Sequence, residues 1–223
     1  MSTSPLVPLL ISLKVAFWAT LAVLPPGIVI GLGLARRSFP GKSVVETLVY
    51  LPLVLPPTAV GYLLLRMLAK DGALDASRLG FDPDLLFTWK GATLASAIMA
   101  LPLVARTARI AFEQVDPRLE AISRTLGSGR VRTFVDVTLP LARRGLLAAG
   151  VIGFSRAVGE FGATVIVAGN IPGRTQTLAL AIFSDIQTGR DQDALLLVGI
   201  TTALAFVAVW SAEWLTRRAQ GAP

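Results

Sequence analysis

The amino-acid sequence predicts an all-α integral membrane protein in which residues 1–223 form a single transmembrane domain with five spanning helices. Hydrophobic residues make up 53% of the chain and charged residues only 16%. A soluble domain carries about a quarter charged residues. The mean hydropathy is +0.67. These values indicate that most of the surface faces lipid.

Each expected helix is a run of about 20 or more mostly apolar residues, the length that crosses the hydrocarbon core. The five runs comprise residues 9–35, 44–69, 88–111, 145–168 and 194–215. The first run has no basic stretch before it and is too long for a signal peptide, so we expect it to remain as a helix.

The charges of the connecting segments predict the orientation. Basic residues follow the first, third and fifth runs, including Arg36, Arg37 and a long arginine-rich segment at 116–140. The other connections contain seven aspartates that dilute their basic residues. Because Lys and Arg concentrate on the cytoplasmic side, we expect an external N-terminus and a cytoplasmic C-terminus in the plasma (inner) membrane. The net charge of +7 is therefore explained without nucleic acid.

Several kinds of chemistry are excluded by composition. Without Cys or His the chain has no disulfide, no thiolate ligand and no histidine base. We expect no catalytic residue, no metal and no bound cofactor. The segment Gly41-Lys42-Ser43 resembles the end of a phosphate-binding loop, but Arg36 stands where that motif needs its first glycine. ATP hydrolysis would then require a separate subunit.

Two polar segments lie between the expected helices on the external side. Residues 70–87 are acidic and contain glycine and proline, which predicts a loop. Residues 169–193 begin with a turn and then contain an apolar run, 178–186, which is too short to span the membrane. This run is expected to be a surface-lying or a re-entrant helix.

The segment 116–140 has the pattern of two short helices joined by a turn. Asp116 can cap the first helix, Pro117 suits its first position, and Gly127 suits its end. Ser128 can cap the second helix, which Pro140 is expected to interrupt. The apolar stripe of the first helix, with Leu119 at its start, can dock in a groove of a partner protein or lie on anionic lipid.

The same segment resembles the signature loop of ABC importer permeases: Glu-Ala-Ala, three residues, Gly, nine residues, Ile, one residue, Leu-Pro. Gly127, Val137, Leu139 and Pro140 match its second half, whereas Ala121-Ile-Ser123 replaces Glu-Ala-Ala and Glu120 stands one position early. In that family the loop is a cytoplasmic coupling helix that inserts into the ATPase subunit. The resemblance assigns coupling to Asp116, Arg118, Leu119, Glu120, Ile122, Arg124, Leu126, Gly127, Leu139 and Pro140.

Further segments are similar to the molybdate branch of these permeases, which have the MetI-like fold. They are 52–58, 124–127, 159–162 and 169–176. Sulfate permeases share Gly-Glu-Phe-Gly and Gly-Asn-Ile-Pro, but Gly173-Arg-Thr-Gln176 favours molybdate. The resemblance implies a permease homodimer, two cytoplasmic ATPase subunits that bind ATP and Mg, and an extracytoplasmic molybdate-binding protein. Tungstate would be a second substrate. A sulfate or thiosulfate permease and an ion-coupled secondary transporter remain the alternatives.

Polar and proline residues inside the expected spans mark candidate pathway residues. Arg156 and Glu160 should face protein or water, because a charge in hydrocarbon costs several kcal/mol. We favour a structural ion pair over a transient attractor for the anion. Pro56, Pro57 and Thr58 predict that the second span lines the pathway, whereas Pro25 and Pro26 predict a packing kink.

The external turn is the candidate docking site for the binding protein. Asn170, Arg174 and Thr175 lie in this turn-rich segment. Only the family resemblance distinguishes this hypothesis from an ordinary solvated loop.

Overall fold

The computed structural model describes residues 4–70, 72–74 and 84–220. Within these ranges the regular structure is entirely helical, so the predicted all-α class is confirmed. Among the described residues, four helices are long and apolar enough to cross a membrane: α1 (Leu6–Arg36), α5 (Trp89–Glu113), the helical segment Arg130–Val158 that ends with α8 (Leu139–Val158), and α11 (Asp191–Gln220). A bent pair of helices is the fifth candidate.

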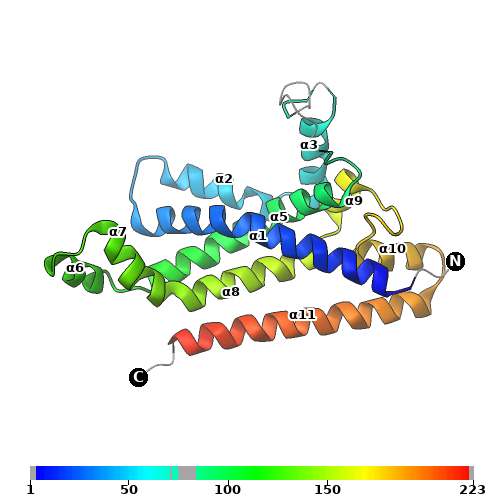
Figure 1. Ribbon diagram of the computed structural model, residues 1–223. Helices are drawn as coiled ribbons and strands as arrows, with labels where there is room; N and C mark the ends of the chain where they lie inside the picture. Colours follow the sequence, from blue (N-terminus) through cyan, green and yellow to red (C-terminus); the bar gives the residue numbers. More distant parts are fainter. Residues whose placement is uncertain (1–3, 71, 75–83, 221–223) are drawn as a thin grey trace.

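The long helices lie side by side along one direction (Figure 1). The start of α1 lies at one end of this bundle, and the end of α11 lies at the other, the end that also holds α6 (Pro117–Thr125) and α7 (Arg130–Thr133). The arginine-rich loop and the end of α11 therefore share one end of the molecule. This arrangement agrees with the alternation of sides that the charges predict.

Small residues allow α1 and α5 to pack closely. A Cβ atom added at Gly27 would lie 2.6 Å from a methyl group of Val104, and one added at Gly31 would lie 2.8 Å from the backbone oxygen of Ala105. Gly27 and Gly31 are four residues apart on one face, the spacing of small residues that lets membrane helices approach. The central cluster is correspondingly rich in alanine from α1, α5 and α8.

The second expected span is not one helix. Residues 44–69 form α2 (Lys42–Val54) and α3 (Pro57–Leu68), which meet at 108°. Leu55 and Pro56 have ψ angles of 142° and 132°. Each precedes a proline, and proline disfavours helical backbone at the residue before it. The helix therefore ends at the Pro56-Pro57 pair, as Figure 1 shows by the turn of α3 away from the bundle.

The fourth expected span, residues 145–168, begins too late and extends too far. Its helix α8 already starts at Leu139 and ends at Val158, and the remaining residues form the separate helix α9 (Gly162–Ala168). Gly159, Glu160 and Phe161 make the break between them. The short helix α9 packs on α3 and α5 instead of continuing the line of α8.

The connections on the side opposite α6 are described in part. Of the predicted loop 70–87, residues 71 and 75–83 lie outside the described residues. The apolar run 178–186 forms α10 (Leu178–Gln187), which packs on α11 and α1. The hydroxyl of Ser12 in α1 accepts a hydrogen bond of 2.7 Å from the backbone N–H of Leu178 at the start of α10.

Candidate functional site

The helix α6 begins and ends where the sequence predicts. The carboxylate of Asp116 accepts a hydrogen bond of 2.8 Å from the backbone N–H of Arg118, and Pro117 occupies the first turn. Gly127 has a φ angle of +89°, a conformation that glycine adopts without a steric penalty. The backbone N–H of Ser128 then bonds to the carbonyl of Ser123, which closes the helix end.

One face of α6 is apolar and uncovered. Leu119, Ile122 and Leu126 are 44%, 55% and 82% exposed. Their spacing of three and four residues places them on one side of the helix. No other part of the described chain buries this face. An apolar helical face of this kind is suited to a groove on a partner.

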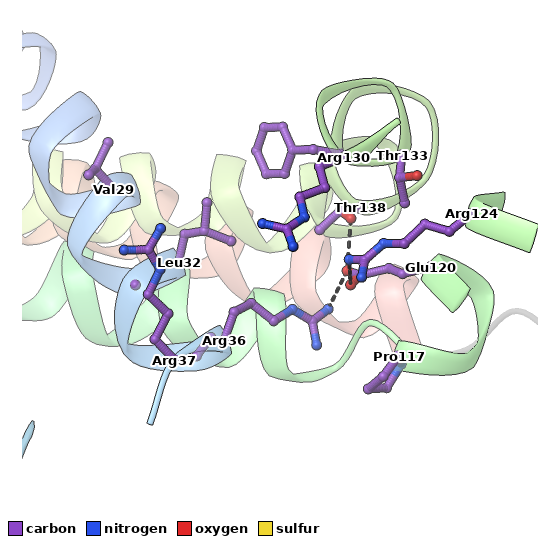
Figure 2. Close-up of a pocket in the computed structure, with 13 residues that line it drawn as sticks. Val29, Leu32, Arg36, Arg37, Pro117, Glu120, Arg124, Arg130, Thr133 and Thr138 are labelled. Atoms are coloured by element: carbon purple, nitrogen blue, oxygen red, sulfur yellow. Dashed lines mark hydrogen bonds and ion pairs between the residues drawn. The ribbon is translucent and has the colours of Figure 1, made fainter. Parts of the chain in front are cut away.

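The opposite face of α6 anchors the helix to the bundle. Glu120 accepts hydrogen bonds from Arg36 and from the hydroxyl of Thr138, both at 2.8 Å, and its second oxygen lies 3.8 Å from Arg124 (Figure 2). Arg36 also donates to the carbonyl of Val115. Glu120 is thus a charged tie between α6, the end of α1 and Thr138, the residue directly before α8. Among the predicted coupling residues of α6, the apolar side chains therefore face outward and Glu120 faces the bundle, whereas Arg118 and Arg124 remain exposed.

The second half of the loop differs from the prediction. Gly129, not Ser128, precedes α7, and the segment continues through the π-helical turn η1 (Phe134–Thr138) directly into α8. The backbone N–H of Leu139 bonds to the carbonyl of Phe134, five residues back. The wider turn accommodates Pro140, which has no N–H to donate and would clash with the carbonyl four residues earlier. Pro140 therefore does not interrupt the helix.

The two helix breaks lie against each other. A Cβ atom at Gly162, the first residue of α9, would be 2.7 Å from Cβ of Pro57 and 3.2 Å from the backbone N of Thr58 at the start of α3. The neighbouring contact, between Gly61 and Ala163, is equally close. Pro56, Pro57 and Thr58 are exposed in the single chain. The predicted pathway residues of the second and fourth spans are therefore brought to one place.

Arg156 and Glu160 form an ion pair of 2.6 Å at this place. Glu160 is only 2% exposed, and its other oxygen accepts a hydrogen bond of 2.8 Å from the backbone N–H of Ala163. The two residues were expected on one helix, but Glu160 lies beyond the end of α8. The pair therefore joins the end of α8 to the start of α9.

The turn at 169–176, which the charges predict to be external, uses most of its polar groups internally. Asn170 donates to Ser184 at 2.7 Å and accepts from Gln176 at 3.0 Å. The buried hydroxyl of Thr175 accepts from the backbone N–H of Ile171. Of the three predicted docking residues, Arg174 is exposed, Asn170 is half-buried and Thr175 is buried.

A basic cluster that lies beside this turn was not predicted from the sequence. Lys14, Lys90 and Arg174, together with Asp84, line a cavity of about 350 Å³, and the ammonium of Lys14 lies 3.7 Å from the ring centre of Trp89. Lys14 is the one charged residue of the run 9–35. A charge inside an apolar run is a signal for a functional or paired residue. By this criterion Lys14 could have been identified from the sequence as a candidate functional residue.

The bundle of long helices, the paired breaks and the exposed apolar helix together define a membrane-spanning protein with an uncovered apolar helical face at one end. The chain belongs to the family described as binding-protein-dependent transport system inner membrane component, whose model matches residues 27–221. It is 45% identical over 211 residues to the molybdenum transport system permease protein ModB of Escherichia coli K12, covering 93% of this chain and 92% of that one. Identity to the sulfate transport system permease protein CysT of Salmonella typhimurium LT2 is 30% over 208 residues, covering 93% and 75%.

Among solved structures, the fold is similar to an inward-facing form of the methionine ABC transporter MetNI. The TM-score is 0.68 at 16% identity, and the match covers 96% of this chain and 94% of that one. The predicted MetI-like permease fold is therefore confirmed.

Proposed function

We propose that this chain is the membrane-spanning permease subunit of an ABC importer that carries molybdate, and also tungstate, into the cytoplasm. The observation that carries the proposal is the identity of 45% to a molybdenum permease over nearly the full length of both chains. The lower identity of 30% to a sulfate permease makes sulfate or thiosulfate the second candidate.

The energy for transport would come from a separate ATPase. Gly41-Lys42-Ser43 forms the turn that starts α2, and Lys42 lies 4.0 Å from Glu46. This segment lies between two helices, so it lacks the strand that precedes a phosphate-binding loop. ATP and Mg would bind to the ATPase subunits, two of which would receive the α6 helices of a permease homodimer. Leu119, Ile122 and Leu126 supply the apolar contact in this proposal.

The pathway would pass the paired helix breaks. Broken backbone at membrane depth is tolerated only where it is buried in protein or lines a water-filled cavity. Pro56, Pro57 and Thr58 are exposed in the single chain, so in the homodimer they would face a water-filled path or the second copy. The chain has no cysteine, which allows a direct test. Thr58→Cys should react with a negatively charged thiol reagent, whereas Leu21→Cys on the outer apolar face of α1 should not.

The external turn and its basic cluster would receive the loaded binding protein. Arg174, Lys14 and Lys90 present positive charge around one cavity. Charge complementarity at such a surface increases the association rate. Arg174→Ala should therefore weaken stimulation by the binding protein and leave basal ATP hydrolysis intact. An equal decrease of both activities would contradict docking at this turn.

ATP hydrolysis by the reconstituted permease–ATPase complex tests the substrate. We expect stimulation by molybdate- and tungstate-loaded binding protein and none by a sulfate-loaded one. Stimulation by sulfate alone would keep the importer and replace its substrate. Basal hydrolysis without stimulation by any of the three would refute these oxyanions as substrates.

Copurification tests the ATPase contact and separates the importer from an ion-coupled secondary transporter, which needs no ATPase. Ile122→Asp should abolish copurification of the ATPase with the permease, because it places a charge in the apolar contact. The matched control is Asp136→Asn, an exposed residue of the same loop. A wild-type permease that never retains an ATPase would favour the secondary transporter.

A further inference from the structure

A cavity of about 790 Å³ lies behind α6, between the end of α1 and the segment α7–η1 (Figure 2). The residues of α6 that line it are Pro117, Glu120 and Arg124. These positions are offset by two residues, about 200° around the helix, from the apolar set proposed to meet the ATPase. The cavity is therefore separate from the proposed ATPase contact.

The charges that line this cavity are not balanced. It is lined by four arginines, Arg36, Arg37, Arg124 and Arg130, and by one carboxylate, that of Glu120. Arg36 and Arg124 share Glu120, and the Nε of Arg36 is buried without a hydrogen-bond partner among the described residues. Arg37 and Arg130 make no ion pair or side-chain hydrogen bond with any other residue that the structure describes. Two guanidinium groups are thus left for an external anion.

The remaining wall is apolar and extends along a membrane-spanning helix. Val29, Leu32 and Gly33 of α1 line the cavity on the same side as Arg36 and Arg37. Val29 is about 10 Å along the helix from Arg36, at 1.5 Å per residue. It is 69% exposed, so this wall is uncovered in the single chain. A soluble anion would occupy only the arginine end and leave the apolar wall bare.

We infer that this cavity binds an anionic phospholipid, with its phosphate between Arg37 and Arg130 and an acyl chain along Val29 and Leu32. Guanidinium groups match phosphate oxygens in a two-point geometry. Basic pockets beside spanning helices on the cytoplasmic side are typical sites for such headgroups. The site rests on the proposed orientation, which places this end of the bundle in the cytoplasmic leaflet. A bound lipid would connect the end of α1 to α7, next to the Arg36–Glu120 pair that ties α6 to α1.

Native mass spectrometry of the permease–ATPase complex in neutral detergent measures this binding. The probes are dioctanoyl-phosphatidylglycerol, which is anionic, dioctanoyl-phosphatidylcholine, which is not, and inorganic phosphate. We expect the wild type to retain phosphatidylglycerol at least tenfold more tightly than phosphatidylcholine. The variant R37Q/R130Q should bind phosphatidylglycerol about 25-fold more weakly, because each basic residue near an anionic lipid contributes about a factor of five. Either single variant should lose about fivefold.

The matched control is Arg132→Gln, which removes an arginine of the same loop whose side chain is 77% exposed and does not line the cavity. It should bind like the wild type. Unchanged phosphatidylglycerol binding by R37Q/R130Q, or an equal loss in R132Q, would overturn the site. Inorganic phosphate that displaced the lipid at equal concentration would assign the cavity to a free anion and also overturn it. Stimulation of ATP hydrolysis by loaded binding protein is measured in a separate experiment. A failure of the molybdate proposal would appear there and would leave the measured lipid affinities unchanged.

Discussion

Arg156 and Glu160 show how a single ion pair can serve the architecture of a membrane protein. The carboxylate of Glu160 is nearly inaccessible, and it binds both the guanidinium of Arg156 and the first turn of α9. Removing one partner of a buried pair leaves an uncompensated charge, which is strongly destabilising. The geometry therefore favours a structural role for Arg156 over a role as a transient attractor for the anion.

We predict that Arg156→Ala lowers the yield of assembled permease–ATPase complex more than it alters substrate selectivity. The variant R156A/E160Q should recover most of the yield, because a glutamine at 160 needs no counter-charge and can still accept from the N–H of Ala163. Yield is measured by the amount of ATPase that copurifies, and selectivity by transport of molybdate against sulfate per complex. Normal yield with selectively lost transport would contradict the structural role.

Glu120 is a second residue whose role depends on which way its side chain points. In the sequence it stands one position before the slot of the family motif, and it was assigned to the coupling set with its neighbours. The structure shows its side chain facing the bundle, 13% exposed, and bonded to Arg36 and Thr138. The hydrophobic periodicity of a nine-residue helix does not predict which of its polar residues will bond to Arg36, 84 positions away in the chain. That contact depends on the packing of α1 beside α6.

We predict that Glu120→Ala destabilises the complex by about 2 kcal/mol, the size expected for hydrogen bonds to a half-buried charged group. Stimulation of ATP hydrolysis by loaded binding protein should also decrease, because α6 loses its tie to α1. Thermal unfolding of the purified complex and the stimulated rate measure the two effects. Asp136→Ala is the control, since the exposed Arg132–Asp136 pair contributes little. Equal unfolding midpoints for the two variants would refute the tie.

At the scale of elements, apolar length alone predicted α1, α5 and α11 within a few residues of their bounds. It did not resolve the second and fourth spans, because apolar composition continues across both breaks. The Pro56-Pro57 pair in the sequence was a signal for the break in the second span. The break at 159–161 is accompanied by the local hydrogen bond from the N–H of Ala163 to Glu160 and by the close contact of Gly162 with Pro57, and the second of these is a tertiary feature.

The contact between α1 and α5 gives a prediction with an internal control. At Gly31 a Cβ atom would lie 2.8 Å from backbone atoms of Ala105 and Arg109, whereas at Gly33 it would meet no atom within 4 Å. Gly31→Ala should lower the unfolding midpoint of the purified complex, because crowding a packed contact costs about 1–3 kcal/mol. Gly33→Ala should leave the midpoint unchanged or raise it slightly, since alanine favours helix. The same decrease in both variants would show that helix separation is not the cause.

At the scale of the whole molecule, the fold places the two proposed contact surfaces at opposite ends of the bundle. The external turn and its basic cluster lie near the start of α1, and the proposed ATPase contact lies beyond the end of α1. Helix α1 extends between them over 31 residues and packs on α5 and α8. In the proposed importer, a movement of α6 would be transmitted through the Arg36–Glu120 pair to α1 and along it to the other end of the bundle. This coupling requires the two ends to be on opposite sides of the membrane.

Because the chain contains no cysteine, its orientation can be read from single introduced thiols. Ser38→Cys lies in the exposed turn between α1 and α2, and Gln187→Cys lies at the exposed end of α10. With an external N-terminus, a membrane-impermeant maleimide should label the thiol at 187 in spheroplasts and the thiol at 38 only after permeabilisation. The reverse pattern would invert the topology, and α6 would then face the wrong side to meet a cytoplasmic ATPase. Labelling of both sites in sealed spheroplasts would place the two ends on one side and contradict the run of α1 across the membrane.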